Sequence, residues 1–180
     1  MIILGLTGSI GMGKSTAVEM FRTLRVLVYD SDAQVHRLLS PGGGAVGPVE
    51  AAFPGVLSNG GIDRAVLRER VFGDAVALTR LESIIHPMVS DVRNRFLGRC
   101  ASRRVALVVL DIPLLFETGN DRNCDATMVV TAPQFLQRAR VLARPGMTPE
   151  TLAKILAHQM PDAEKRRRAD FVVPSNLGRG

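Results

Sequence analysis

The feature that most constrains the fold is a glycine-rich segment near the N-terminus, where residues 8–15 read GSIGMGKS. An apolar run at residues 2–6 precedes this segment, and a helical pattern of apolar residues follows it at residues 18–24. Strand, glycine-rich turn and helix in this order form a loop whose backbone N–H groups can surround phosphate oxygens. We therefore predict a nucleotide-phosphate loop here and reject the alternative of a chance glycine-rich turn.

Each residue type in this segment has a chemical part to play. Glycines let the backbone curl without a Cβ clash, and the following helix adds the positive end of its dipole. Lys14 supplies a mobile charge to the β- and γ-phosphates, and the Ser15 hydroxyl is placed to bind Mg²⁺. We expect nucleotide contacts from Gly8, Gly11, Met12, Gly13, Lys14, Ser15 and Thr16.

Composition limits the partners that this chain can have. The 180 residues suffice for one main domain with an inserted lobe, and the net charge of +6 comes from 23 Lys and Arg against 17 Asp and Glu. With one Tyr, no Trp and no long basic run, the chain lacks the pattern of a nucleic-acid-binding surface. Arginines that bind a polyphosphate substrate explain the same excess of charge. We therefore expect a small-molecule substrate and no nucleic acid.

The sequence also favours a cytoplasmic protein. No apolar run is long enough to span a bilayer, and no basic region precedes the N-terminal apolar run as it would in a signal peptide. Cys100 and Cys124 are too few for a disulfide framework and lack the spacing of metal ligands. These observations predict no membrane association.

A second apolar run, at residues 26–29, ends at Asp30 and Asp32. A short continuous run of this kind is typical of a strand buried on both faces of a parallel sheet, whose carboxyl edge binds ligands. Asp30 or Ser31 could instead cap a helix over residues 33–39. Because one cap does not require two carboxylates, we expect at least one of them to act on phosphate chemistry.

Residues 31–100 lack a convincing strand and predict a helical lobe inserted between the strands of a sheet. Glycines and prolines keep residues 40–62 irregular, apart from one short helix around 49–53. Helical patterns then follow from residue 63, with an interruption at 73–74 and a break or kink at His86-Pro87, because Pro disfavours helical geometry in the residue before it.

The strongest strand signal in the chain lies at residues 105–110 and is followed by Asp111. An apolar strand that ends in Asp resembles the second acidic element of phosphate-loop enzymes, where the carboxylate helps to hold Mg²⁺. A cap on the following turn remains equally open for Asp111. Leu114 and Glu117 bring apolar bulk and another carboxylate to the same edge, and further strands are expected at 126–131 and 170–173.

Between these last strands, two helices joined by a short turn carry Arg140 and Arg144, which lie four residues apart and so share a helix face. Such a hairpin suits a lid that closes over phosphates, although a solvated basic face is the alternative. The basic run at residues 165–168 is expected to be a solvated helix end, with the alternative that one of its members reaches the nucleotide. The alternation of strands and helices, the inserted lobe and the arginine-bearing hairpin together predict a small-substrate kinase.

Five segments resemble the dephospho-CoA kinase family across almost the entire chain. They are residues 6–16, 30–32, 86–87, 111–117 and 166–173. The phosphate loop is shared by many kinases, whereas the Asp-x-Asp at this distance combined with PLLFE at residues 113–117 is much more specific. The family usually has Ala where Ser31 stands, a small change that leaves both carboxylates in place.

The resemblance implies an α/β fold of the P-loop NTPase class, with a doubly wound parallel sheet of about five strands, an inserted helical substrate lobe and a helical lid. Its nucleotide-binding core would comprise residues 1–30, 101–137 and 166–180. The substrate lobe would cover residues 31–100 and the lid residues 138–165, and the chain would be a monomer or a weak homo-oligomer. The loop on the adenine side would lie within residues 174–180.

The resemblance further implies a phosphotransferase that moves the γ-phosphoryl group of ATP to the 3′-hydroxyl of dephospho-CoA, the last step of coenzyme A biosynthesis. The implied base is Asp32, with Lys14 bridging the phosphates and Arg140 clamping the transferred group. The remaining implied contacts are Arg144 to the nucleotide, Asp30, Asp32, His86, Leu114 and Glu117 to the substrate, and Ser15 and Asp111 to Mg²⁺. Alternatives are another small-molecule or nucleotide kinase and, less favoured, a non-catalytic nucleotide-dependent binding protein.

Overall fold

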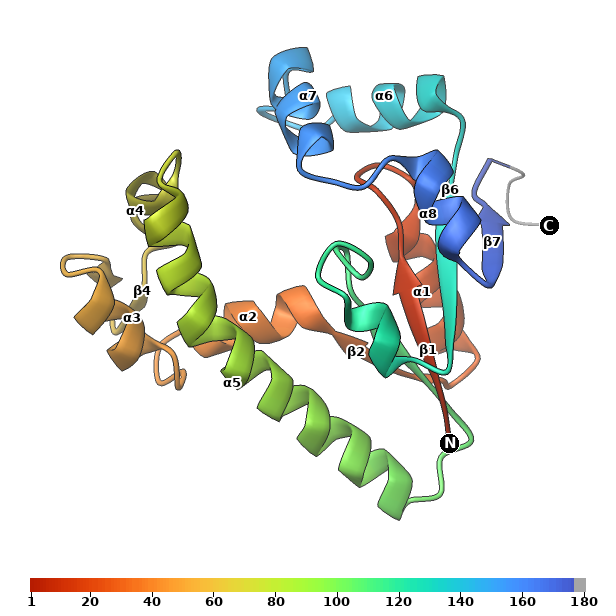
Figure 1. Ribbon diagram of the computed structural model, residues 1–180, viewed down its shortest axis with the longest axis horizontal. Helices are drawn as coiled ribbons and strands as arrows, with labels where there is room; N and C mark the ends of the chain where they lie inside the picture. The colour runs from red at the N-terminus through yellow and green to blue at the C-terminus, as the bar shows by residue number, and fades with distance from the viewer. Residues whose placement is uncertain (177–180) are drawn as a thin grey trace. The chain divides into compact units, whose positions relative to one another are not determined.

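A computed structural model describes residues 1–176 of the chain as two compact units. One unit combines residues 1–29 with residues 103–176, and the other comprises Asp30–Ser102 (Figure 1). Part of the segment expected on the adenine side, residues 177–180, lies outside the described residues. Each unit has its own hydrophobic core, which is described separately below.

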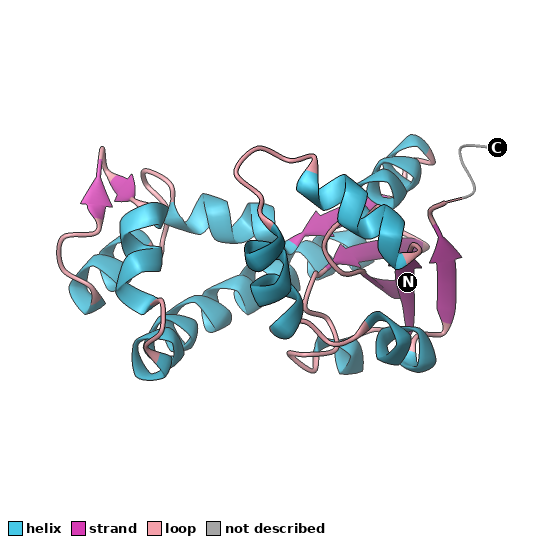
Figure 2. Cartoon of the chain, turned by 90° about the horizontal axis from the view of Figure 1, so that it is seen from above, coloured by secondary structure: helices cyan, strands magenta, loops and turns pink. Residues whose placement is uncertain are grey.

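A five-stranded sheet with the strand order β2-β5-β1-β6-β7 forms the centre of the first unit. Figure 2 draws its strands in magenta and the helices in cyan. Its strands are β1 (Ile2–Thr7), β2 (Leu27–Asp30), β5 (Leu107–Asp111), β6 (Ala126–Thr131) and β7 (Phe171–Pro174). β1 pairs in parallel with both β5 and β6, and β6 pairs in parallel with β7. The expected α/β fold with a parallel sheet of about five strands is therefore confirmed.

The apolar run of β1 becomes the middle of this sheet because it can be buried on both faces. Leu4 and Leu6 are buried with Val109 of β5 and Val130 of β6, and Val18 packs on them from α1 (Lys14–Thr23). The register places Leu6 of β1 opposite Asp111, the last residue of β5. The carboxyl ends of the two strands consequently meet at the segment where the phosphate loop begins.

β2 differs from the buried strand that its sequence predicts. It is an edge strand, so Leu27 is exposed, Val28 is partly buried and only Tyr29 is fully buried. The prediction of burial on both faces was wrong, because an apolar run of four residues does not reveal whether a second neighbouring strand is available.

The remaining helices of the first unit are α6 (Gln134–Leu142), α7 (Pro149–Ala157) and α8 (Asp162–Arg168), with the 3₁₀ turn η1 (Asn120–Asn123). Thr148 caps α7 through its side chain, with Pro149 in the first turn as the sequence favours. α6 contacts α7, and α8 contacts β6. The helix pair expected from the sequence is therefore present within this unit.

The second unit contains α2 (Ser31–Leu39), α3 (Val46–Ala52), α4 (Arg64–Val71), α5 (Ala75–Ser102) and a short hairpin of β3 (Leu57–Ser58) and β4 (Gly61–Ile62). α5 contacts α2, α3 and α4. The buried core includes Leu39, Val49, Phe53, Leu67 and Ile85, which come from four different helices or their ends. The lobe is therefore held together by apolar faces that meet along α5.

The hairpin corrects the expectation that residues 31–100 contain no strand. Asn59 and Gly60 both have positive φ angles, of 49° and 79°, which is the backbone of a two-residue type I′ turn. Asn-Gly is a strong hairpin signal in a sequence, but the paired strands are only two residues long, so no alternating pattern flanks it. The hairpin could therefore have been predicted only from its Asn-Gly turn, because its strands are too short to show an alternating pattern.

α5 contradicts a helix break at Pro87, one of the two alternatives, a break or a kink, that the sequence left open. The helix continues through Pro87 from Ala75 to Ser102, and it begins where Asp74 accepts hydrogen bonds from the N–H groups of Val76 and Ala77. An interior Pro costs about 3 kcal/mol in a helix. Burial of Ile85 and packing of apolar neighbours on both sides of Pro87 offset this cost. Within residues 1–176, no helix has both the length and the apolar character needed to cross a membrane.

Two glycines of the lobe differ in backbone conformation but have equal space for a side chain, so they can be compared as Gly→Ala variants. A Cβ would meet nothing within 4 Å at either Gly73 or Gly98, but Gly73 has a φ of +80° whereas Gly98 lies inside α5. We expect Gly98→Ala to stabilise the protein by about 0.5–1 kcal/mol, because it reduces the backbone freedom of the unfolded chain. Gly73→Ala should destabilise it by about 1 kcal/mol. Equal urea midpoints for the two variants would contradict this assignment.

Asp170, which directly precedes β7, makes a pH-dependent contribution to stability through its hydrogen bonds to β6. Its Oδ2 accepts hydrogen bonds of 2.8 Å from the hydroxyl and the N–H of Thr127, which lower the pKa of this exposed carboxyl. The pKa of this carboxyl is lower in the folded protein than in the unfolded chain, where it is about 3.9. Ionised Asp170 therefore stabilises the fold above that pH, and this stabilisation is lost as the pH falls through the folded-state pKa. Thermal melting should show Asp170→Asn below wild type at pH 7, with the difference shrinking towards pH 3.

Candidate active site

The backbone of the phosphate loop requires glycine at several of its positions. Gly11 and Gly13 have φ angles of +76° and +89°, which favour glycine. A Cβ on Gly8 would lie 2.8 Å from the carbonyl oxygen of Val130, and one on Gly11 would lie 2.5 Å from the Val141 side chain. The three glycines of the sequence pattern are therefore required by conformation, by close approach or by both.

The helix that follows the loop begins without a side-chain cap. Gly13 occupies the capping position of α1, and the first helical hydrogen bonds run from the N–H groups of Thr16 and Ala17 to its carbonyl oxygen. The N–H groups of Lys14 and Ser15 precede these bonds and so have no acceptor within the helix. Ser15 and Thr16 are exposed. This helix start has the donors and the dipole that an anionic phosphate requires.

Lys14 forms an ion pair with Asp111, with 2.5 Å between Nζ and Oδ1. The side chain of Asp111 is 7% exposed and that of Lys14 is 18% exposed, so solvent screens the pair only weakly. The β1–β5 register explains the contact, because it brings the end of β5 beside the loop that leaves β1. Two residues that the sequence separates by almost a hundred positions thus share one site.

Arg140 of α6 lies against the loop. Its guanidinium donates to the hydroxyl of Ser175 at 2.8 Å, to the carbonyl oxygen of Ser175 at 3.0 Å and to the carbonyl oxygen of Gly11 at 3.4 Å. The Ser175 hydroxyl in turn donates to the carbonyl oxygen of Met12 at 2.7 Å. Arg140 and Ser175 therefore fix the position of the loop, and the guanidinium is placed next to it.

Two amides support the other side of the loop at Ile10. Gln137, which is buried in α6, donates to the Ile10 carbonyl oxygen at 2.8 Å, and the Ile10 N–H donates to Gln159 at 3.1 Å. Neither glutamine forms a motif in the sequence, and Ser175 lies in a segment without a recognisable pattern. These supporting residues could not have been found from spacing alone, since they act through tertiary contacts.

The other expected site residues are distributed between the two units. Arg144 follows the last turn of α6 and is exposed, and Leu114 is 37% exposed. Asp30, Asp32 and His86 belong to the lobe. Asp30 caps α2 by accepting a 2.9 Å hydrogen bond from the N–H of Ala33, so the capping alternative holds for this residue. Asp32 and His86 are exposed on α2 and α5.

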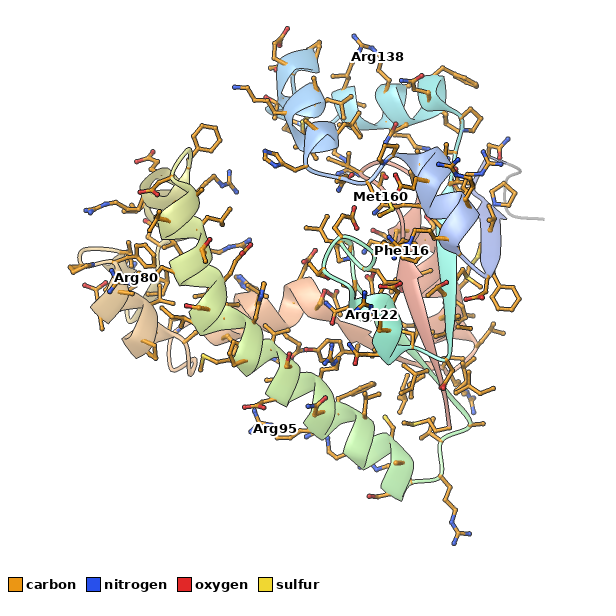
Figure 3. The ribbon with its side chains drawn as sticks, viewed as in Figure 1. Arg80, Arg95, Phe116, Arg122, Arg138 and Met160 are labelled. Carbon is orange, nitrogen blue, oxygen red and sulfur yellow. The ribbon has the colours of Figure 1, made fainter. Side chains whose placement is uncertain are left out.

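Lys165 is the clearest departure from the sequence expectation. It was expected at a solvated helix end, yet its side chain is fully buried and its Nζ lies 2.9 Å from Oε1 of Glu117. The same ammonium donates to the carbonyl oxygen of Pro113 at 3.2 Å, and Glu117 also accepts from the N–H of Met160 at 2.8 Å. Figure 3 labels Met160, whose N–H makes this bond, and Phe116, which precedes Glu117 in the chain. A basic run shows charge but not which of its members faces inward.

Among the described residues 1–176, no group of three or more His, Cys, Asp or Glu side chains could hold a metal ion. The chain offers Ser15 and Asp111 at the phosphate loop, one hydroxyl and one carboxylate. Mg²⁺ in nucleotide sites takes one or two protein ligands and completes its shell with phosphate oxygens and water. The sparse donor set at the loop therefore fits Mg²⁺ brought with a nucleotide.

Comparison with known sequences gives a consistent result. The sequence profile of dephospho-CoA kinase matches residues 2–178. The chain is 60% identical over 166 residues to the dephospho-CoA kinase of Paramagnetospirillum magneticum, which covers 92% of this chain and 78% of that protein. It is 58% identical over 178 residues to the dephospho-CoA kinase of Mesorhizobium japonicum, which covers 99% of this chain and 89% of that protein.

Comparison with solved structures supports the same architecture. A crystal structure of a Thermus thermophilus protein superposes with a TM-score of 0.85 at 37% identity, covering 98% of this chain and 90% of that one. Dephospho-CoA kinase from Campylobacter jejuni gives a TM-score of 0.64 at 24% identity, covering 97% and 88%. Shikimate kinase from Acinetobacter baumannii gives 0.53 at 19% identity, covering 99% and 86%. The last two show the shared fold alone.

The buried ion pair generates a stability prediction. Lys165→Ala leaves the Glu117 carboxylate, whose side chain is 17% exposed, without its cation, and the buried Oε2 atom of Glu117 already has no hydrogen-bond partner. We expect a loss of about 3–5 kcal/mol in urea unfolding, and recovery of most of it when Glu117→Met accompanies Lys165→Met.

The matched control for this prediction is Arg22→Ala, which breaks an exposed pair with Glu19 and should cost about 0.5 kcal/mol or less. A loss from Lys165→Ala as small as that from Arg22→Ala would show that the buried pair does not hold α8 in place.

Proposed function

The chain belongs to the dephospho-CoA kinase family, and from that premise we propose which of its residues carry the phosphorylation of dephospho-CoA by ATP. The reaction places a phosphoryl group on the 3′-hydroxyl of dephospho-CoA and yields coenzyme A and ADP, the last step of coenzyme A biosynthesis. The observation that supports our assignment most strongly is the uncapped start of α1 behind a glycine loop that Arg140 and Ser175 hold in position. We place the reaction in the cytoplasm, in keeping with only two cysteines.

The phosphate loop binds the nucleotide through its backbone. In this proposal the N–H groups of Gly13, Lys14 and Ser15 point at the phosphate oxygens of ATP, as the conformation of Gly11 and Gly13 allows. Lys14 lies beside the loop and exchanges its contact with Asp111 for the β- and γ-phosphates. The exchange keeps the ammonium among anionic oxygens before and after the nucleotide binds.

Mg²⁺ would be held by the Ser15 hydroxyl and by Asp111, directly or through water, together with phosphate oxygens. When bound, the ion neutralises charge on the phosphate oxygens. Release of Asp111 from Lys14 makes its carboxylate available for this role. Asp111 at the end of β5 and Lys14 at the start of α1 are already in contact, so this exchange of partners involves side chains that lie at one site.

Asp32 is our proposed base. It lies in the first turn of α2, directly after Asp30 has capped that helix, and its side chain is exposed. A carboxylate that accepts a hydrogen bond from a ribose 3′-hydroxyl orients the oxygen for attack and takes its proton. In the same proposal Asp30, His86, Leu114 and Glu117 contact the acceptor, and residues 31–100 form its lobe.

The arginines of the helix pair would act on the transferred group. Arg140 has its guanidinium at the loop, and we propose that it donates to the γ-phosphoryl oxygens as charge develops on them. Arg144, four residues further, would bind the nucleotide from the same lid, residues 138–165. Phosphoryl transfer needs little covalent chemistry from the protein, so positioning and charge neutralisation carry the reaction.

The direct test is incubation of the protein with Mg-ATP and a panel of acceptors. We expect phosphorylation of dephospho-CoA in preference to nucleoside monophosphates and shikimate, with product identified by mass spectrometry as carrying phosphate on the 3′-oxygen. Equal or faster phosphorylation of a nucleoside monophosphate would overturn the choice of acceptor and leave a different small-molecule kinase on this fold.

Asp32→Asn tests the base. The amide keeps the size of the side chain but cannot take a proton, so we expect kcat to fall by about 100- to 10,000-fold with nearly unchanged affinity for ATP. The control is Asp91→Asn, an exposed carboxylate on α5 that has no role in the proposal. A kcat within a factor of a few of wild type would remove Asp32 from the base role.

A further inference from the structure

One buried charge in the first unit has no place in the roles assigned above. Lys165 of α8 is fully buried, which is rare for a lysine unless its ammonium is paired. Its partner is Glu117, but a buried ion pair is often no more stabilising than apolar side chains of the same volume. Stability alone does not explain why a charged pair occupies this position. The contacts of the ammonium lead to the nucleotide site by two routes.

The first route leads to the carboxyl end of β5. Nζ of Lys165 donates to the carbonyl oxygen of Pro113 at 3.2 Å. The same oxygen accepts at 2.9 Å from the hydroxyl of Thr7, the residue directly before the phosphate loop. A carbonyl oxygen has two lone pairs, so these two donors satisfy it. Pro113 follows Asp111 by two residues, and the two donors therefore fix the end of the segment that carries the partner of Lys14.

The second route leads to the phosphate loop through the linker between α7 and α8. Glu117, which pairs with Lys165, also accepts from the N–H of Met160 in this linker at 2.8 Å. The neighbouring Gln159 accepts from the N–H of Ile10 in the phosphate loop at 3.1 Å. The ion pair thus anchors the linker that supports the loop at Ile10.

Together these contacts form a closed network within one compact unit. Its members all lie in residues 1–29 or 103–176, and they are Thr7, Ile10, Pro113, Glu117, Gln159, Met160 and Lys165. Both routes meet at Lys165. Removal of its ammonium consequently opens the network at two points, one towards β5 and one towards the linker.

We propose that Lys165 is a positioning residue of the nucleotide site. Its ammonium holds the carboxyl end of β5 in place through Pro113, and it holds the phosphate loop in place through Glu117 and the linker. Because its side chain is fully buried, Lys165 acts through these groups and not by contact with the nucleotide. The inference rests on the proposed function, because it takes the phosphate loop as the ATP site and Asp111 as a partner of Mg²⁺.

The expected effect is on the binding of Mg-ATP. Groups that hold metal or phosphate contacts in place reduce the ordering that a ligand must otherwise impose. Without the ammonium, Pro113 loses one of its two donors and Glu117 loses its cation, so the site is no longer held in one arrangement. Glu117 is also a proposed acceptor contact, and nucleotide binding is therefore measured with no acceptor present.

Calorimetric titration of the full chain with Mg²⁺ and a non-hydrolysable ATP analogue tests the proposal. We expect the Kd to rise by about 10- to 100-fold in Lys165→Met and in the double variant Lys165→Met/Glu117→Met, because both lack the ammonium. The double variant has no unpaired carboxylate, so it separates this effect from a loss of stability. All titrations are made at a temperature at which circular dichroism shows every variant folded.

The matched control is Arg168→Met on the same helix. Arg168 pairs with Asp121 at 3.0 Å, and its guanidinium lies 4.8 Å from the centre of the Phe116 ring. Like Lys165→Met, this change removes a cation and an ion pair from α8, but neither contact belongs to the network. We expect the control to bind the analogue with the Kd of wild type, because exposed ion pairs contribute little.

The outcomes separate this inference from the function on which it rests. If the double variant binds the analogue as tightly as wild type does, Lys165 serves stability alone and the inference is wrong. Equal weakening in Arg168→Met would trace the effect to α8 as a whole and would also overturn it. A wild type that binds the analogue but does not phosphorylate dephospho-CoA would refute the proposed acceptor and leave the role of Lys165 to be decided by the binding data.

Discussion

Hydrogen bonds to the carbonyl groups of the phosphate loop are the interactions on which the nucleotide site depends. The loop turns its N–H groups towards the expected phosphates, so its carbonyl groups point away and need donors from elsewhere. Gln137 supplies one donor to Ile10, Ser175 supplies another to Met12, and Arg140 reaches Gly11. A loop without these donors would keep its glycines but lose the single conformation that prepares it for an anion.

The sequence predicted the parts of this protein whose function depends on local pattern. The glycine loop, the apolar strand before it and the strand that ends at Asp111 all have signals within ten residues, and each is present as an element. The helix pair before β7 was equally evident, because Pro149 and a capping Thr148 mark its second start. In these segments the structure favoured by the local sequence is the one that the whole fold adopts.

Two of the errors have a common physical origin, which is that burial is decided by partners far along the chain. Lys165 looked solvated among three arginines until Glu117 and Pro113 gave it a buried position. Pro87, where a break or a kink was expected, lies inside α5 with apolar core residues on both sides of it. The roles of Asp32 as the base and of His86 as a substrate contact stay predictions, since they come from a family resemblance and concern a bound substrate.

The bond between Ser175 and Met12 spans 163 residues, and this separation has a consequence for how the protein is made. During synthesis the lobe is complete as soon as residue 102 has emerged, and it can collapse on its own core. The phosphate loop, although made first, must wait for nearly the last described strand before its carbonyl groups find their donors. A growing chain would therefore complete the lobe early and the phosphate loop late, and a chain interrupted before Ser175 would hold its lobe without a fully supported phosphate loop.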